Sequence, residues 1–300
     1  MLLHCLGVAA GGGYPQWNCA CAGCRKARSN PELGSMHAGL AVSGDGERWF
    51  LLNATPDVHH QIAMDRCLHP GPGIRTTPVA GVLLTDAEFD HTIGLLMLRE
   101  ESSLTVYGTY PVLEALALRF PVRELLSDYA DLSWSLVEIG KPLDLDDRLR
   151  VTAFLTGSKA PRYMGRSQLH RESKEWEVGF RLQDKVTGGT AVYAPTLPRW
   201  DEKFAEQVAS ADCVFLDGTF WTDDEMSCRG AGSRSGRSMG HMPVSGEDGS
   251  ALALAALPAK RKIYTHINNT NPILDEGSEE RRWLAGLGIE VGRAGLEVEL

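Results

Sequence analysis

The segment TDAEFDH holds the residues of this chain with the clearest chemistry. It places an aspartate directly before a histidine, Asp90 and His91, and adds two further carboxylates, Asp86 and Glu88. Carboxylate oxygens and imidazole nitrogens are ligands that iron and zinc bind in proteins. Another candidate ligand, His266, lies far along the chain in YTHINNTN. These residues predict a metal site if the fold brings them together.

A second cluster, CACAGC, carries Cys19, Cys21 and Cys24 in the spacing Cys-x-Cys-x-x-Cys. Three thiolates at this spacing can reach one tetrahedral ion, and thiolate is the ligand that structural zinc prefers. A coincidental group of cysteines in a loop is the alternative. The segment 19–24 is therefore predicted to be a zinc loop near the N-terminus.

The cysteine count indicates the redox compartment. The chain has seven cysteines, an odd number, and its first residues, MLLHCLGVAAGGG, lack the basic head and the cleavage site of a signal peptide. An odd count without an export signal favours reduced thiols over a disulfide framework. We therefore expect a cytoplasmic protein.

Length and composition limit the classes of protein to consider. The chain has 300 residues, of which 43% are hydrophobic and 23% charged, as is typical of a globular chain with a large core. No window approaches the ~20 apolar residues of a membrane helix, so no membrane partner is expected. A net charge of −9 works against a nucleic-acid partner, because phosphate binding relies on clustered lysine and arginine. We expect a single domain over residues 1–300.

Alternating apolar and amphipathic runs predict the elements that must position these residues. A first strand in MLLHCLG leads into a glycine turn. Further strands are predicted at 49–55, 79–85, 104–107, 148–155, 177–183, 190–194, 212–217, 261–266 and 289–292. Helices are predicted at 111–119, 200–210, 247–257 and 278–286, and a mobile loop at 229–240. Helices interspersed among strands predict helix-covered sheets, in the α/β or α+β class.

Several polar residues lie just past the carboxyl ends of the predicted strands. They are Asp57, the pair Asp90 and His91, Asp217, and His266. Each has a simpler explanation when taken alone, such as a helix cap for Asp57 or a turn for Asp217. Ligand sites in α/β sheets collect at this edge, so together they predict one shared site.

The chain resembles the metallo-β-lactamase fold, an αββα four-layer sandwich with two sheets between helix layers. The resemblance rests on DAEFDHTIGL, the preceding apolar strand, a Gly-His at 240–241 and the strand that ends in His266. Within that superfamily, VAAGGGYPQWNCACAGC, LLNATPD, DGTFWTDDEM and HINNTNPILDE are similar to the pyrroloquinoline quinone (PQQ) biosynthesis protein B family. The similarity spans essentially the whole chain.

The resemblance implies how the metal is held. Hydrolases of this fold carry H-x-H-x-D-H, in which the first two histidines serve one metal, whereas this chain has Asp86 and Glu88 at those positions. Asp90, His91 and His266 remain, a two-histidine, one-carboxylate set that is typical of non-haem Fe(II) oxygenases. A mononuclear zinc hydrolase is the competing interpretation, because zinc also takes nitrogen and oxygen ligands.

The resemblance also implies a reaction and roles for further residues. The chain would hydroxylate a tyrosine-derived Glu-Tyr precursor of PQQ, with O₂ as co-substrate. His241 would act as an acid or base, with a loop histidine of no consequence as the equal alternative. Asp86, Glu88 and Asp217 would orient ligands or relay protons. Carboxylates of the substrate would be met by Arg234 and Arg237, for which a solvated loop is the simpler explanation. Relatives with phosphodiesterase activity have a histidine where this chain has Asn269, which makes Asn269 a candidate fourth zinc ligand.

Three alternatives remain open at this level. The chain could be a non-catalytic carrier of PQQ or its precursor, or a zinc hydrolase. It could also be a paralogue in a related peptide-derived pathway, because it departs from the family pattern at 34–38 (GSMHA), at Thr196, and at positions 86 and 88. The expected partners are a small peptide or PQQ precursor, with a homodimer left open.

Overall fold

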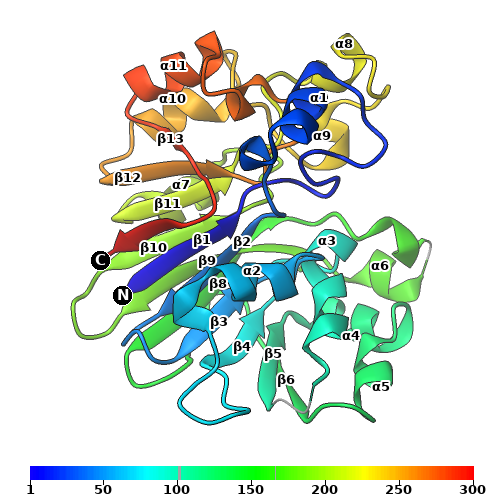
Figure 1. Cartoon of the computed structure of the whole chain (residues 1–300), viewed down its shortest axis with the longest axis vertical. Helices are drawn as coiled ribbons and strands as arrows, with labels where there is room; N and C mark the ends of the chain where they lie inside the picture. The colour runs from blue at the N-terminus through cyan, green and yellow to red at the C-terminus, as the bar shows by residue number, and fades with distance from the viewer. Residues whose placement is uncertain (101–102, 166) are drawn as a thin grey trace.

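The computed structural model describes residues 1–100, 103–165 and 167–300. Two seven-stranded sheets pack face to face, and helices cover their outer faces (Figure 1). This arrangement confirms the predicted sandwich of two sheets between helix layers. None of the helices in the described ranges combines the length and the apolar character that crossing a bilayer requires.

The first sheet has the order β14-β1-β2-β3-β4-β5-β6. Strands β3 to β6 run parallel to one another, and the other pairs are antiparallel. The strands are β14 (Leu296–Glu299), β1 (Leu2–Gly7), β2 (Gly39–Ser43), β3 (Trp49–Leu52), β4 (Val79–Leu83), β5 (Leu104–Gly108) and β6 (Leu132–Leu136).

The second sheet has the order β13-β12-β11-β10-β9-β8-β7. Here β10 to β13 are parallel, and β7 to β10 pair antiparallel. The strands are β13 (Glu290–Val291), β12 (Arg261–Thr265), β11 (Cys213–Asp217), β10 (Thr190–Ala194), β9 (Glu177–Asp184), β8 (Leu149–Gly157) and β7 (Pro142–Asp144).

The helices are short, and several begin at a side-chain cap. In α11, Ser278 accepts a hydrogen bond from the Arg281 amide, and two glutamates in the first turn complement the helix dipole. The α-helices are α1 (Ala22–Ser29), α2 (Val58–Met64), α3 (Phe89–Thr92), α4 (Tyr110–Leu118), α5 (Val122–Leu126), α6 (Gln168–Glu172), α7 (Glu202–Val208), α8 (Glu225–Cys228), α9 (Gly236–Met239), α10 (Ser250–Ala255) and α11 (Glu279–Gly286). The 3₁₀ helices are η1 (Pro31–Leu33), η2 (Arg66–Leu68), η3 (Ile93–Leu98), η4 (Arg162–Met164) and η5 (Pro272–Leu274).

Alternation along the strands builds two layers of core. In β3, Phe50 and Leu52 belong to the core that includes the facing second sheet, whereas Trp49 and Leu51 belong to the core under α2, α4 and α5. Successive side chains of a strand point to opposite faces, so a strand that is buried on both faces reads as one continuous apolar run. This is why the run 49–55 was identifiable as a strand.

The predicted strands and helices are all present, with shifts of a few residues at their ends. The ranges predicted from apolar runs omit strands β2, β6, β7 and β14, and they omit the short helices between the predicted elements. Most of the missed helices have only three to five residues, which are too few to show a helical period. The predicted loop 229–240 contains one such helix, α9.

Candidate metal centre

The carboxyl end of β4 carries one half of the site. The chain turns after the strand, and Asp86 accepts a hydrogen bond from the Glu88 amide at 2.9 Å before α3 begins. The carbonyl of His91 accepts a bond from the Ala54 amide at 2.8 Å, which ties α3 to the end of β3. A Cβ on Gly94 would lie 2.0 Å from a backbone oxygen, so only glycine permits this close approach.

The second sheet supplies the other half. Asp217, the last residue of β11, pairs with Thr265 of the parallel strand β12, which places His266 beside the turn after β11. His266 has a φ of 53°, in the left-handed region that favours glycine. The hydroxyl of Thr219 lies 2.7 Å from the His266 carbonyl and 2.8 Å from its Nδ1. These bonds hold His266 in a backbone conformation that is otherwise unfavourable.

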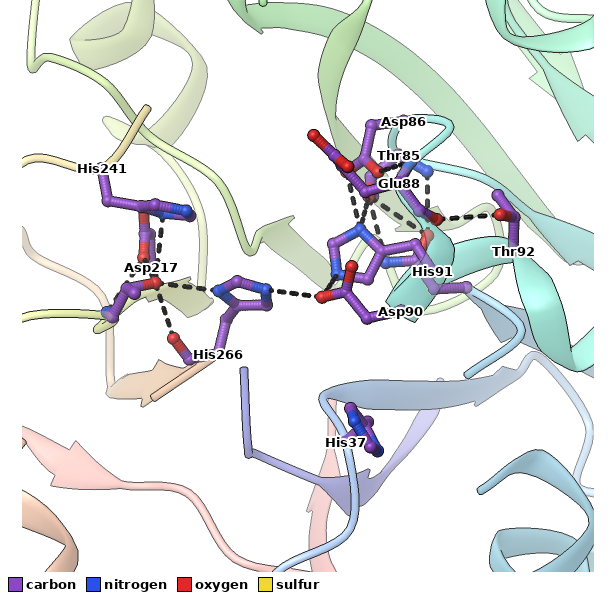
Figure 2. Close-up of polar contacts among 12 residues, drawn as sticks. His37, Thr85, Asp86, Glu88, Asp90, His91, Thr92, Asp217, His241 and His266 are labelled. Carbon is purple, nitrogen blue, oxygen red and sulfur yellow. Dashed lines mark hydrogen bonds and ion pairs between the residues drawn. The ribbon is translucent and has the colours of Figure 1, made fainter. Parts of the chain in front are cut away.

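The two halves meet where the sequence predicted a metal. Asp90, His91 and His266 offer ligand atoms that all lie within 4.8 Å of one another. Asp90 Oδ2 is 3.4 Å from Nε2 of His266 and 3.7 Å from Nε2 of His91 (Figure 2). The Nε2 atom of His91 is buried and has no hydrogen-bond partner among the described residues. A buried nitrogen lone pair without a partner, facing a carboxylate and a second imidazole, fits a bound metal ion.

Asp86 fixes the orientation of His91. Its Oδ2 lies 2.7 Å from Nδ1 of the histidine and 2.9 Å from the Thr85 hydroxyl, and both side chains are almost fully buried. When the ring is neutral, as a metal ligand must be, Asp86 keeps its one proton on Nδ1, so the lone pair is on Nε2 and faces the site. Metal-binding histidines commonly donate their other ring N–H to a carboxylate in this way.

The charges of the site are strongly coupled. Burial lowers the pKa of His91, but the carboxylates of Asp86 and Asp90 outweigh it and raise the pKa to about 9. Burial favours the neutral acid of Asp90, yet His91 and His266 hold its pKa well below the ordinary range. Burial lowers the pKa of His266. The site therefore combines an ionised carboxylate with an imidazole that is ready to bind metal in its neutral form.

A second carboxylate–histidine pair, Asp217 with His241, lies at the end of the second sheet and resembles the pair of Asp86 with His91. Its Nδ1 lies 2.7 Å from Asp217 Oδ2, and its ring stacks on His266 with centroids 5.2 Å apart. Burial lowers the pKa of His241, but Asp217 raises it above the ordinary value. Asp217, His241 and His266 also offer ligand atoms within 4.8 Å. The geometry therefore permits His241 to act as a proton donor or as an additional ligand.

Asp86, Asp90, His91, His241 and His266 line a cavity of about 310 Å³, whereas Asp217 lies behind His241 and is not among the lining residues. Glu88 and Thr196 also line it, so two departures from the family pattern face the cavity besides Asp86. Arg234 lines this cavity, whereas Arg237 lines a neighbouring one. Asp57 is not among its lining residues; it instead holds Nδ1 of His37 at 2.6 Å. Figure 2 shows His37 apart from the other histidines.

The three cysteines of the predicted zinc loop lie together near the N-terminus of α1. Their sulfurs are within 4.8 Å of one another, and Nδ2 of Asn269 lies 3.2, 3.7 and 3.3 Å from Cys19, Cys21 and Cys24. The amide of Asn269 therefore lies within contact of all three sulfurs, where a fourth ligand would be needed. Rotation of the amide by 180° would place its oxygen, the atom that can ligate zinc, at this position.

Three residues of the site were missed from the sequence. Thr219 bonds to Asp217, to His266 and to Nδ1 of His241 at 3.1 Å, and it lies only two residues after Asp217 in DGT. Glu177 and Lys159 line the cavity from β9 and from the loop after β8. The sequence around a charged residue at the end of a strand does not show which distant residues it will contact. Glu177 and Lys159 could therefore be identified only from the tertiary packing.

Substitution of Asp86 by asparagine should weaken metal binding roughly 10–100-fold, the usual effect of removing a carboxylate that orients a metal-binding histidine. The amide keeps the size of the carboxyl group but removes the charge that holds the proton on Nδ1 of His91. Calorimetric titration of metal-free protein with Fe(II) under argon measures the change. Asp57→Asn alters an equivalent pair, Asp57 with His37, outside the cavity and should leave the affinity unchanged.

Glu177 should make stability depend on pH. Burial raises its pKa to about 7, so the folded chain favours the protonated acid. The Glu177 carboxyl therefore contributes stability below the pKa that it has in the unfolded chain, and this contribution is lost as the pH rises through its folded pKa of about 7. The free energy of unfolding of Glu177→Gln, relative to that of the unmodified protein, should therefore rise by about 2–3 kcal/mol between about pH 5 and pH 8. Urea unfolding of both proteins at each pH measures the gap, and a constant gap would contradict the argument.

Comparison with known proteins defines the class first. The protein family described as "Beta-lactamase superfamily domain" matches residues 48–267 of this chain. This range includes Asp86, Asp90, His91, Asp217 and His266. The two mixed sheets with flanking helices are the metallo-β-lactamase fold, as the resemblance implied.

The relatives then identify the family. "Coenzyme PQQ synthesis protein B" of Pseudomonas syringae pv. syringae is 41% identical over 100% of both chains, and that of Cupriavidus necator is 42% identical over 99% of both. The crystal structure of Zn²⁺-bound PqqB from Methylobacterium extorquens is 35% identical, covers 100% of both chains and superposes with a TM-score of 0.93. The chain belongs to the coenzyme PQQ synthesis protein B family, as its sequence motifs indicated.

Proposed function

We propose that this chain is an iron-dependent oxygenase of PQQ synthesis that hydroxylates a tyrosine-derived Glu-Tyr precursor. The observation that carries the proposal is the cluster of Asp90, His91 and His266 with the unpartnered Nε2 of His91. Positions 86 and 88 bear carboxylates, and Asp86 is committed to His91. This ligand set matches the two-histidine, one-carboxylate sites of Fe(II) oxygenases.

Asp90, His91 and His266 would hold the metal. Iron held by two imidazoles and one carboxylate keeps open positions at which O₂ and a substrate can be activated side by side. Asp86 keeps the proton of His91 on Nδ1, and the Thr219 hydroxyl lies 2.8 Å from Nδ1 of His266, so Nε2 of each ring is the atom left to face the site. Both rings thus present Nε2 to the same point, and neither needs to reorient when metal binds.

His241 and two arginines would handle the substrate. Nδ1 of His241 is held by Asp217, so Nε2 is the atom that exchanges a proton with the phenol. Arg162 and Arg234 line the cavity and can bind substrate carboxylates. Hydroxylation replaces a ring C–H by C–OH with one oxygen atom of O₂. The other oxygen atom becomes water, with two protons and two electrons from an added reductant such as ascorbate.

A zinc hydrolase is the second candidate, because a relative of this chain has been crystallised with Zn²⁺ bound. Zinc would use the same three residues and activate water instead of O₂. The carboxylates at positions 86 and 88 weigh against a two-metal hydrolase, since they replace two imidazoles that the hydrolases of this fold use. A carrier of PQQ would need the cavity without the metal.

An isotope experiment distinguishes these functions. Metal-free protein is reconstituted with Fe(II) under argon, given a Glu-Tyr peptide and ascorbate, and exposed to ¹⁸O₂. Mass spectrometry should find one ¹⁸O atom per hydroxylated product, and the Fe(II) protein should show a change in its near-infrared circular dichroism when peptide binds before oxygen is added. The second readout does not depend on turnover.

The outcomes separate the three candidates. Label in the peptide supports the oxygenase. Cleavage of a phosphodiester by zinc-loaded protein, lost in His91→Ala, would establish the hydrolase instead. Tight binding of PQQ to metal-free protein without incorporation of label into the peptide would establish the carrier.

A further inference from the structure

A second cavity adjoins the metal cavity. It has a volume of about 400 Å³ and is lined by residues from the end of β8, the segment before β9, the segment that leads into α7, and α9. Lys159 and Glu177 line both cavities, so they form the wall between them. A ligand in the second cavity would lie one side chain away from the metal cavity.

This cavity concentrates positive charge in an acidic protein. The chain as a whole carries a net charge of −9. The cavity is nevertheless lined by five basic and two acidic residues: Lys159, Lys174, Arg199, Lys203 and Arg237 against Glu177 and Asp201. Cations gathered in a concave surface attract small anions and raise their local concentration.

Two of these cations are available for a ligand. Arg199 is paired with Asp201 at 3.0 Å, and Nζ of Lys159 donates to the Met239 carbonyl at 2.6 Å. The side chains of Lys174 and Lys203 are exposed and make no hydrogen bond or ion pair with other described residues, although Lys203 is near enough to Asp201 to help lower the pKa of that carboxyl. Their ammonium groups can therefore turn toward a bound carboxylate without breaking an existing contact.

The cavity also has an apolar floor. Leu155 lies near the end of β8 and is 44% exposed, whereas most apolar residues of this strand are buried. Pro198 lines the same cavity. An inorganic anion would leave these two side chains in water. A ring with carboxylates at its edge would cover them and still reach the lysines.

Two glycines leave room for the wall that Lys159 and Glu177 form. A Cβ on Gly157 would lie 2.0 Å from Oε2 of Glu177, and a Cβ on Gly240 would lie 3.3 Å from the Lys159 side chain. Oε2 of Glu177 accepts a hydrogen bond from the Lys159 amide at 3.0 Å. A side chain at Gly157 would displace Glu177, whereas one at Gly240 would require only a small shift of the Lys159 side chain, so Gly157 is the residue that keeps this separation in place.

We propose that the second cavity is a binding site for an aromatic polycarboxylate, which lies with its ring on Leu155 and its carboxylates on Lys174 and Lys203. The choice of polycarboxylate rests on the proposed function, in which substrate and product derive from glutamate and tyrosine. The site would hold such a molecule beside the metal cavity, before or after reaction.

Binding of benzene-1,3,5-tricarboxylate to the protein as purified, followed by calorimetry, tests this site. The double variant Lys174→Ala and Lys203→Ala should bind the probe roughly tenfold more weakly, because two exposed cations each contribute a few-fold. The affinity should also fall with salt, since the screening length shortens from about 10 Å at 0.1 M to about 3 Å at 1 M. Pyrophosphate should bind more weakly than the tricarboxylate, because it cannot use the apolar floor.

The matched control is Lys141→Ala with Lys260→Ala, two surface lysines that are 68% and 79% exposed and lie outside both cavities. This variant carries the same change in net charge and should bind the probe as the unmodified protein does. Binding should also persist in His91→Ala, which lacks the proposed metal and cannot turn over, so this result does not depend on the oxygenase reaction. Equal weakening in both double variants, loss of binding in His91→Ala, or equal affinity for pyrophosphate would overturn the proposal.

Discussion

Replacement of Asp90 by alanine should remove the active-site iron and reduce turnover to the background of metal-free protein. Asp90 is the single carboxylate of the proposed ligand set, and it lies 3.4 and 3.7 Å from the two imidazole nitrogens. Without it, the metal loses an anionic ligand. The loss should exceed the ~10–100-fold effect expected when a residue outside the ligand set is changed.

Iron content by plasma mass spectrometry, measured beside turnover, checks this prediction. His241→Ala is the matched comparison, because His241 stacks on His266 but is not part of the proposed ligand set. It should retain iron and lose activity roughly 10–100-fold. If Asp90→Ala kept a full complement of iron, or if His241→Ala lost it, the assignment of ligands would be wrong.

The triple variant Cys19→Ser, Cys21→Ser and Cys24→Ser should lose its zinc and melt roughly 5–10 °C lower than the unmodified protein. Structural zinc contributes about 10–16 kcal/mol to small zinc fingers. In a chain of this size only part of that energy should appear as global stability, and a few kcal/mol correspond to this shift. Cys21 also caps α1 by accepting a bond from the Cys24 amide, so α1 should loosen first.

Zinc content and hydrogen exchange together test the zinc loop. Faster exchange should be confined to α1 and to the segment around Asn269, whose amide faces all three sulfurs. Cys228→Ser changes an exposed cysteine that belongs to none of the candidate metal clusters of the described residues and should alter neither zinc content nor melting temperature. Absence of zinc from the purified protein, or an unchanged melting temperature in the triple variant, would contradict the prediction.

The amino-acid sequence by itself determined the features that depend on neighbours along the chain. Apolar runs such as 79–85 identified the buried strands, because a strand that is covered on both faces needs a continuous run. The adjacency of Asp90 to His91 and the spacing of the three cysteines identified the two candidate metal sites, because local geometry already holds those donors close together. Edge strands such as β6 (LSWSL) have half-exposed polar residues and no such signal.

The tertiary structure alone decided which distant residues meet. His266 reaches Asp90 across 176 positions because the two sheets pack with the carboxyl ends of β4 and β12 at one edge. Only this packing commits Asp86 to His91 and ties Thr219 to both His241 and His266. Burial and hydrogen bonding are properties of the folded surroundings of a side chain. A sequence can therefore specify a metal ligand, but only the packed fold sets its orientation and its charge.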